Sequence, residues 1–141
     1  PSRRGPRCAS SDPGESIGQG EISMMEVMLV AIGGAGGALI RFALTHLLPL
    51  WRGFPLAILA ANVVGSFALG VIIVVASQSQ FLLLGVGLCG GLTTVSTWAI
   101  DTLTLGRSGA SGVATVNVVV SVAASVGACA VGMLLAGGMG S

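Results

Sequence analysis

Four hydroxyl-bearing side chains follow a pair of glycines inside a long apolar region of this chain, in the stretch GLCGGLTTVSTW over residues 87–98. Hydroxyl groups donate hydrogen bonds, and burying them in an apolar medium costs free energy unless they find a partner. Each glycine lowers helix propensity by about 1 kcal/mol relative to alanine. If a helix breaks here, its freed carbonyls can bind a cation, while the hydroxyls beyond them can bind an anion.

Two further polar stripes lie in other apolar regions. Asn62 and Ser66 are one helical turn apart, and Asn117, Ser121 and Ser125 follow one another at the same spacing. Residues four apart share one face of a helix. Taken singly, each residue is explained by an interhelical hydrogen bond contributing about 0.6 kcal/mol. The two aligned stripes, together with the hydroxyl cluster, favour a polar pathway through the apolar region.

The missing residue types indicate what such a pathway carries. The chain has no Lys, and Asp101, near the end of the third apolar segment, is the only carboxylate after Glu26. Proton-coupled exporters and cation pores generally use an acidic side chain inside the membrane. Amide and hydroxyl donors and the positive edges of aromatic rings suit a small anion instead. Arg41 has two interpretations: it extends to the membrane surface, or it lines a vestibule and concentrates anions.

Catalysis is not expected. One histidine and scattered hydroxyls do not form a nucleophile and base pair, and the GGAGG motif at 33–37 lacks the preceding strand of a dinucleotide-binding loop. Cys8, Cys89 and Cys129 have no CxxC spacing, so they predict no metal site of the Cys/His type. We therefore expect no enzyme, no organic cofactor and no nucleic acid partner.

The composition requires these residues to be positioned by membrane helices. Hydrophobic residues make up 53% of the chain and charged residues 8%, whereas soluble domains average about 25% charged residues. A bilayer core needs roughly 20 apolar residues per helix. Four segments satisfy this length: 27–48, 55–76, 81–105 and 113–136. The sequence therefore predicts an all-α, multi-pass membrane protein.

Residues 1–23 have a different composition, rich in Pro, Gly, Ser and charge. Such a segment cannot bury enough apolar surface to fold by itself. We expect a disordered leader or a non-native extension at 1–23, followed by a transmembrane domain at 24–141.

The charge pattern only weakly specifies the orientation of the helices. Arg52 and Arg107 lie in two of the loops, and the loop at 77–80 carries no charge. Because an excess of Lys and Arg in short loops sets orientation, this small excess permits insertion in both directions and an antiparallel homodimer. A single fixed orientation is the alternative. Small-residue stripes such as Gly33 and Gly37 also allow close helix packing, and they predict a tight oligomer.

Three motifs in this order resemble the CrcB/Fluc family of fluoride channels. They are GGAGGALIR at 33–41, ANVVGSFALG at 61–70 and GLCGGLTTVSTW at 87–98, and the similarity extends over residues 27–136. The resemblance implies a four-helix subunit with a broken third helix, which forms an antiparallel, dual-topology dimer with two narrow pores. It further implies passive export of fluoride across the plasma membrane.

The resemblance also implies roles for individual residues. The backbone carbonyls of Gly90 and Thr93 would hold a structural sodium ion at the dimer interface. Asn62 would be the pore asparagine and Arg41 the vestibule arginine. The polar track would include Thr94, Ser96, Thr97 and Ser121, and Trp98 and Asn117 complete the predicted anion-binding residues, which we call the predicted pore set.

Two departures from the family pattern leave alternatives open. Val95 stands where the family has the first of two phenylalanines, with Trp98 at the second, and Asn117 stands where a tyrosine is common. A valine has no positive ring edge for an anion. The chain could therefore be a non-conducting subunit, or one half of a heterodimer with a related subunit. A small four-helix cation or multidrug exporter is less favoured, because its nearest carboxylate, Glu26, lies at the edge of the first helix.

Overall fold

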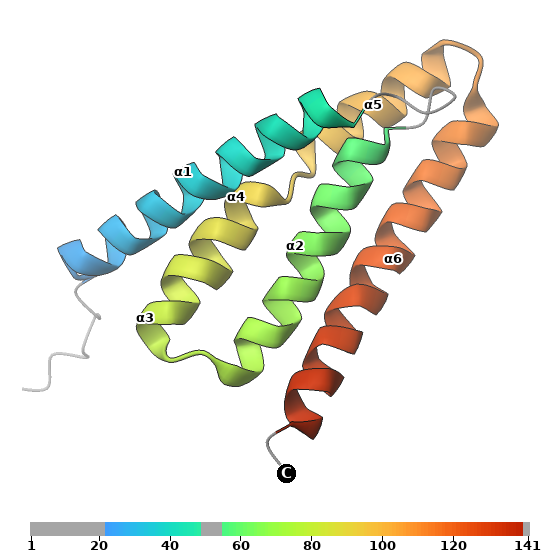
Figure 1. The fold of residues 1–141 in the computed structure, drawn as a ribbon. Coiled ribbons are helices and arrows are strands. Elements are labelled where there is room, and N and C mark those ends of the chain that lie inside the picture. Colours follow the sequence, from blue (N-terminus) through green and yellow to red (C-terminus); the bar gives the residue numbers. More distant parts are fainter. Residues whose placement is uncertain (1–21, 49–54, 140–141) are drawn as a thin grey trace, which may run out of the picture.

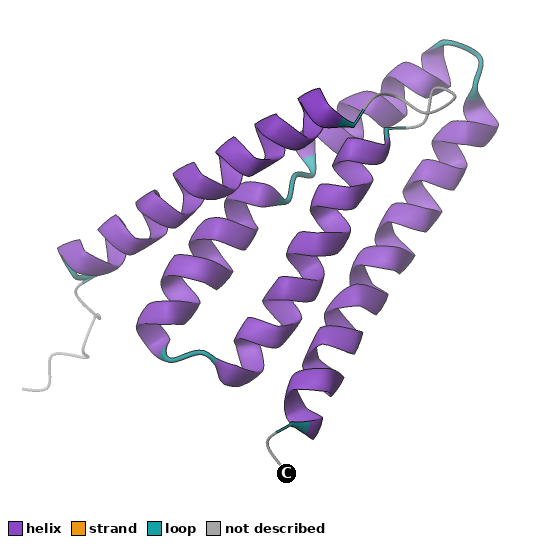
Figure 2. Cartoon of the chain, in the orientation of Figure 1, coloured by secondary structure: helices purple, strands orange, loops and turns teal. Residues whose placement is uncertain are grey.

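The computed structural model describes residues 22–48 and 55–139, and every regular element within them is helical (Figures 1 and 2). The elements are α1 (Met24–Leu47), α2 (Leu56–Val75), α3 (Gln78–Gln80), η1 (Phe81–Cys89), α4 (Gly90–Leu92), α5 (Ser96–Arg107) and α6 (Ser111–Gly138). Four spans are long and apolar enough to cross a membrane: Met24–Leu47, Leu56–Val75, Gln78–Arg107 and Ser111–Gly138. The predicted all-α protein with four spanning helices is confirmed. Most of the predicted leader, residues 1–21, and Arg52 lie outside the described residues.

Helix α1 begins at Met24, before the apolar run that predicted it. Ser23 and Glu26 form a capping box, in which the Ser23 N–H donates to Glu26 Oε2 at 3.1 Å and the Met25 N–H donates to Ser23 Oγ at 3.3 Å. These bonds satisfy N–H groups that the first turn of a helix leaves without partners. The cap therefore extends the helix beyond its hydrophobic segment.

The spans pack in an order that Figure 1 makes plain. Helix α1 lies against η1 and α4, α2 lies between them and α6, and α2 runs alongside α6. The start of α1 and the end of α6 lie at the same end of the bundle. Few side chains are buried, among them Ala61, Ile58 and Leu92, whereas large apolar residues such as Leu39 and Leu134 face outward. This distribution suits a bundle surrounded by lipid.

Glycines bring α1 and the third span into backbone contact. A Cβ atom at Gly33 would clash with the backbone of Leu83, and one at Gly37 would clash with the backbone of Leu88. From the other side, a Cβ at Gly91 would clash with the carbonyl of Gly34. The predicted small-residue stripe of the first helix therefore packs within the chain, and this face is not available to a second copy.

The third span is the least regular of the four. Its segment η1 is a π-helix, which the hydrophobic pattern does not predict, and α4 ends at Leu92. Thr93 has extended backbone angles (φ −73°, ψ 151°), and α5 begins only at Ser96, after the loop that Figure 2 shows between α4 and α5. Gly90 itself keeps helical angles (φ −63°, ψ −38°). The interruption thus follows the two glycines and does not occur at them.

Candidate functional site

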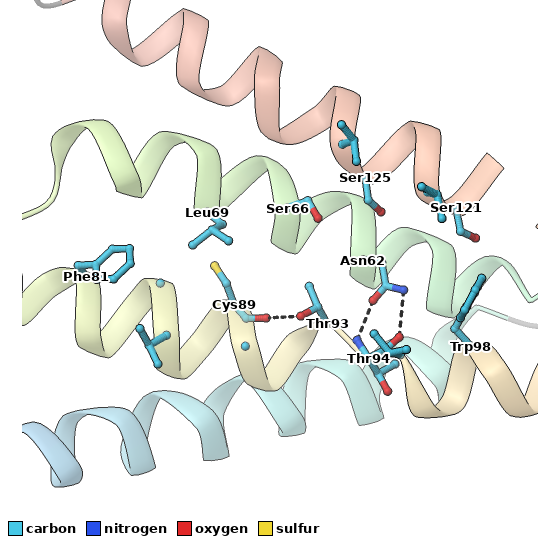
Figure 3. Close-up of a pocket in the computed structure, with 16 residues that line it drawn as sticks. Asn62, Ser66, Leu69, Phe81, Cys89, Thr93, Thr94, Trp98, Ser121 and Ser125 are labelled. Atoms are coloured by element: carbon cyan, nitrogen blue, oxygen red, sulfur yellow. Dashed lines mark hydrogen bonds between the residues drawn. The ribbon is translucent and has the colours of Figure 1, made fainter. Parts of the chain in front are cut away.

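A cavity of about 540 Å³ lies between α2, the third span and α6 (Figure 3). Its walls are apolar toward Leu69 and Phe81, and polar toward Asn62, Thr94 and Ser121. The lining residues are Asn62, Ser66, Leu69, Phe81, Gly85, Val86, Cys89, Gly90, Thr93, Thr94, Val95, Trp98, Ser121, Val122, Ser125 and Val126. No Asp, Glu, Lys, Arg or His is among these described residues. The cavity offers neutral hydrogen-bonding groups between largely apolar walls.

Asn62 and Thr94 form a reciprocal pair at the polar end of the cavity. The Thr94 backbone N–H donates to Asn62 Oδ1 at 2.8 Å, and Asn62 Nδ2 donates to the Thr94 carbonyl at 3.2 Å. Figure 3 shows both bonds between α2 and the non-helical residues after α4. Because both backbone groups of Thr94 lie where the helix is interrupted, the side-chain amide supplies partners that the helix no longer provides.

The Thr94 hydroxyl organises the start of α5. Its oxygen accepts the Thr97 N–H at 3.3 Å, lies 3.2 Å from Ser96 Oγ, and is 3.3 Å from Thr97 Oγ1. A hydroxyl that accepts an N–H in the first turn of a helix acts as a cap. Three residues of the predicted pore set are therefore brought together, but only Thr94 lines the cavity; Ser96 and Thr97 do not.

Thr93 turns its hydroxyl back to its own helix. Both its backbone N–H and its Oγ1 donate to the Cys89 carbonyl, at 2.9 Å and 3.0 Å. Because the ψ angle of Thr93 is extended, its carbonyl does not point along the helix axis as the carbonyls of a helix do. Within the described residues, no group of three or more His, Cys, Asp or Glu could hold a metal ion.

Asn117 is buried in a hydrogen-bonded relay between α6 and α5. Its Nδ2 donates to Thr102 Oγ1 at 2.9 Å, the Thr102 hydroxyl donates to the Trp98 carbonyl at 2.8 Å, and Ser121 Oγ donates to Asn117 Oδ1 at 3.4 Å. Asn117 is 1% exposed and does not line the cavity. Thr102 is not in the predicted pore set. Its position one turn after Trp98, on the same helical face, was the signal in the sequence that could have identified it.

Two further members of the predicted pore set, Trp98 and Arg41, lie in different surroundings, as does Val95, which departs from the family pattern. Trp98 lines the cavity, and its Nε1 is buried without a hydrogen-bond partner in the described part of the chain. Val95 also lines the cavity but is 75% exposed. Arg41, half-buried on α1, is not part of the lining. Conversely, Ser66 and Ser125 line the cavity and face it in Figure 3, although the predicted pore set omits them; the helical spacing from Asn62 and Ser121 was the signal for both.

Comparison with known proteins places this chain in a family. A family profile described as "CrcB-like protein, Camphor Resistance (CrcB)" matches residues 28–133. The chain is 37% identical over 121 residues to the fluoride-specific ion channel FluC of Pyrococcus furiosus, covering 82% of this chain and 98% of that protein. It is 42% identical over 112 residues to FluC 2 of Rhodococcus jostii, covering 79% and 98%. It is also 42% identical over 121 residues to FluC of Methanopyrus kandleri, covering 78% and 91%. Since the profile covers most of the chain and these relatives align over nearly their full length, the chain belongs to the CrcB family.

Proposed function

We propose that this chain is a subunit of a passive, fluoride-selective channel that exports fluoride across the plasma membrane. The observation that carries the proposal is the cavity at Asn62, whose described lining combines amide and hydroxyl donors with no acidic side chain. The relatives named as fluoride-specific ion channels support the choice of fluoride among small anions. In this proposal the chain catalyses no reaction. Fluoride moves passively, down its own concentration gradient.

Fluoride must exchange its water shell for protein hydrogen bonds on this path. The described part of the chain gives Ser66 and Ser125 no hydrogen-bond partner, so both hydroxyls are available as donors beside Asn62. The Ser121 proton is directed to Asn117 in this conformation. We assign anion contacts to Asn62, Thr94, Trp98 and Ser121, with Ser66 and Ser125 added. Arg41, Ser96 and Thr97 act at the approach to the path by raising the local anion concentration or by holding the α5 terminus.

An antiparallel, dual-topology homodimer is part of the proposal. Val95 and Val86 border the cavity and are 75% and 44% exposed, and Gly90 beside them is also exposed. A second copy would cover these residues and close the open side of the cavity. A structural sodium ion would fit between the copies, since the carbonyls of Gly90 and Thr93 from each chain together supply the hard oxygen ligands that such a cation prefers. The heterodimer with a related subunit is the competing assembly, and Val95 is the residue that favours it.

Reconstituted liposomes test the function directly. The purified chain is placed in liposomes loaded with potassium fluoride, a potassium ionophore is added, and a fluoride electrode follows release. We expect fluoride release that requires the protein, with no release of chloride from matched potassium chloride liposomes. Equal release of both halides would contradict the proposed selectivity, and retention of fluoride would contradict conduction by this chain alone.

A further inference from the structure

We propose that Asn62 is a positioning residue that creates the interruption in the third span, in addition to facing the ion path. The proposal rests on the proposed function, since the interruption matters for an ion path along this span. Its basis is the pair of hydrogen bonds that join Asn62 to both backbone groups of Thr94.

Asn62 takes one backbone N–H donor, that of Thr94, away from the helix. In a continuous α-helix the N–H of residue i donates to the carbonyl of residue i−4. The Thr94 N–H would therefore donate to the Gly90 carbonyl, but it donates to Asn62 Oδ1 at 2.8 Å instead. The Thr93 N–H donates to Cys89. Asn62 Oδ1 thus competes with the Gly90 carbonyl for the Thr94 N–H. Because this N–H donates to Asn62, the Gly90 carbonyl is left without it.

Asn62 also satisfies the backbone groups that the interruption leaves without helical partners. Helix ends inside a membrane are tolerated only where other groups satisfy the backbone. The Asn62 amide does this with both of its ends, because its Nδ2 also donates to the Thr94 carbonyl at 3.2 Å. Thr94 is 7% exposed, so water does not replace these partners. One primary amide therefore satisfies both groups of one peptide residue.

The two bonds to Thr94 fix the orientation of the Asn62 side chain. A primary amide has two N–H donors and one carbonyl acceptor. Since Oδ1 accepts from Thr94 and one N–H donates to Thr94, a flip of the amide would place like groups against each other at both bonds. Asn62 also lines the cavity, so its one remaining N–H is held in a fixed direction beside the cavity. The same residue positions the span and presents a single donor.

The substitution Asn62→Asp tests this assignment because its donor properties change with protonation. A neutral carboxylic acid can accept the Thr94 N–H and donate to the Thr94 carbonyl, whereas the ionised form can only accept. Cys89 is the only titratable side chain among the described residues of the cavity lining. A change with pH in Asn62→Asp that is absent from the wild type therefore reports on position 62.

Amide hydrogen exchange at Thr94 is the readout, measured by NMR on full-length protein labelled at threonine nitrogen and corrected for the intrinsic pH dependence of exchange. We expect protection of Thr94 to fall by about tenfold or more in Asn62→Ala, as for loss of a buried hydrogen bond. In Asn62→Asp, the ionised carboxylate still accepts the Thr94 N–H but faces the Thr94 carbonyl with no proton to donate, so we expect the melting temperature to be low near neutral pH and to rise in acid. Ser66→Ala, one turn along the same wall, leaves Thr94 protection unchanged.

Unchanged protection of Thr94 in Asn62→Ala would overturn the proposal. If Asn62→Ala does not fold, Asn62→Asp alone decides, because it keeps the size of the side chain: a melting temperature that changes with pH no more than that of the wild type overturns the assignment. Fluoride release by the wild-type chain is measured on the same preparation. Its absence would count against the proposed function, whereas hydrogen exchange at Thr94 does not depend on conduction.

Discussion

At the scale of single residues, the two asparagines of the chain have different kinds of hydrogen-bond partner. Asn62 lines the cavity and bonds to backbone, whereas Asn117 lies outside the lining and bonds to the side chains of Thr102 and Ser121. The sequence predicted that both asparagines would find partners, because an unpartnered amide in hydrocarbon is costly. It could not separate the two roles, since the choice depends on which helix faces each residue. Asn117 therefore remains a predicted anion-binding residue whose described contacts are those of an interhelical bond.

The Thr102→Val substitution tests the Asn117 relay. It removes the hydroxyl that accepts from Asn117 Nδ2 and leaves a buried amide donor without its partner. We expect a loss of about 1–3 kcal/mol in the free energy of unfolding, the cost of an unsatisfied buried polar group. Reversible unfolding in detergent, followed by circular dichroism, provides the measurement.

Thr104→Val is the matched control on the same helix. The Thr104 hydroxyl is exposed and donates only to the Ile100 carbonyl of its own helix. Its removal should change the unfolding free energy by no more than about 0.5 kcal/mol, as is usual for surface positions. Equal effects of the two substitutions would mean that the Asn117 bond contributes nothing of its own.

At the scale of elements, the positions of the four spans followed directly from hydrophobic length. The predicted first segment, 27–48, and the observed α1, Met24–Leu47, differ mainly by the capping box at Ser23. The π-helix η1 could not be predicted in the same way. Its Gly87 packs against the backbone of Gly33 in another span, and hydrophobic periodicity within one segment carries no information about such a contact. The same reason explains why the interruption lies at Thr93 and not at the glycines that suggested it.

The contact between α1 and the third span gives a prediction at this scale. Gly33→Ala would place a methyl group against the backbone of Leu83 and Leu88. Since a helix backbone cannot move aside as a side chain can, we expect a loss of about 1–3 kcal/mol or more, the range for overpacking. The melting temperature in detergent measures it.

Gly36→Ala serves as the control for Gly33→Ala, because a Cβ atom at Gly36 meets nothing within 4 Å. Both substitutions raise helix propensity equally, by about 1 kcal/mol in an α-helix. Their difference therefore isolates the interhelical contact. If Gly33→Ala were as stable as Gly36→Ala, the close packing of α1 on η1 would be wrong.

At the scale of the whole molecule, the exposed side of the cavity decides between the proposed assemblies. Val95 is 75% exposed there, at the position where the family pattern has a phenylalanine. An aromatic ring would offer its positive edge to an anion and would bury more apolar area against a second copy. Within the described part of one chain, most of the Val95 side chain is uncovered, so contacts inside the chain do not distinguish the two assemblies. This is also why the sequence could not choose between a homodimer and a heterodimer.

The Val95→Phe substitution tests whether the missing ring limits conduction. If two copies of this chain form the path, the added ring edge should raise fluoride release in the liposome assay several-fold, by about tenfold if it contributes about 1.4 kcal/mol to the barrier. Val86→Phe, on the same exposed side but on η1, controls for added bulk and should not raise release. Chemical crosslinking in the same liposomes shows whether both variants remain dimeric.

An increase in Val86→Phe equal to that in Val95→Phe would remove the special role of position 95. No increase in Val95→Phe, with strong release after addition of a related subunit, would favour the heterodimer, because the second chain would then supply contacts that a ring at position 95 does not replace.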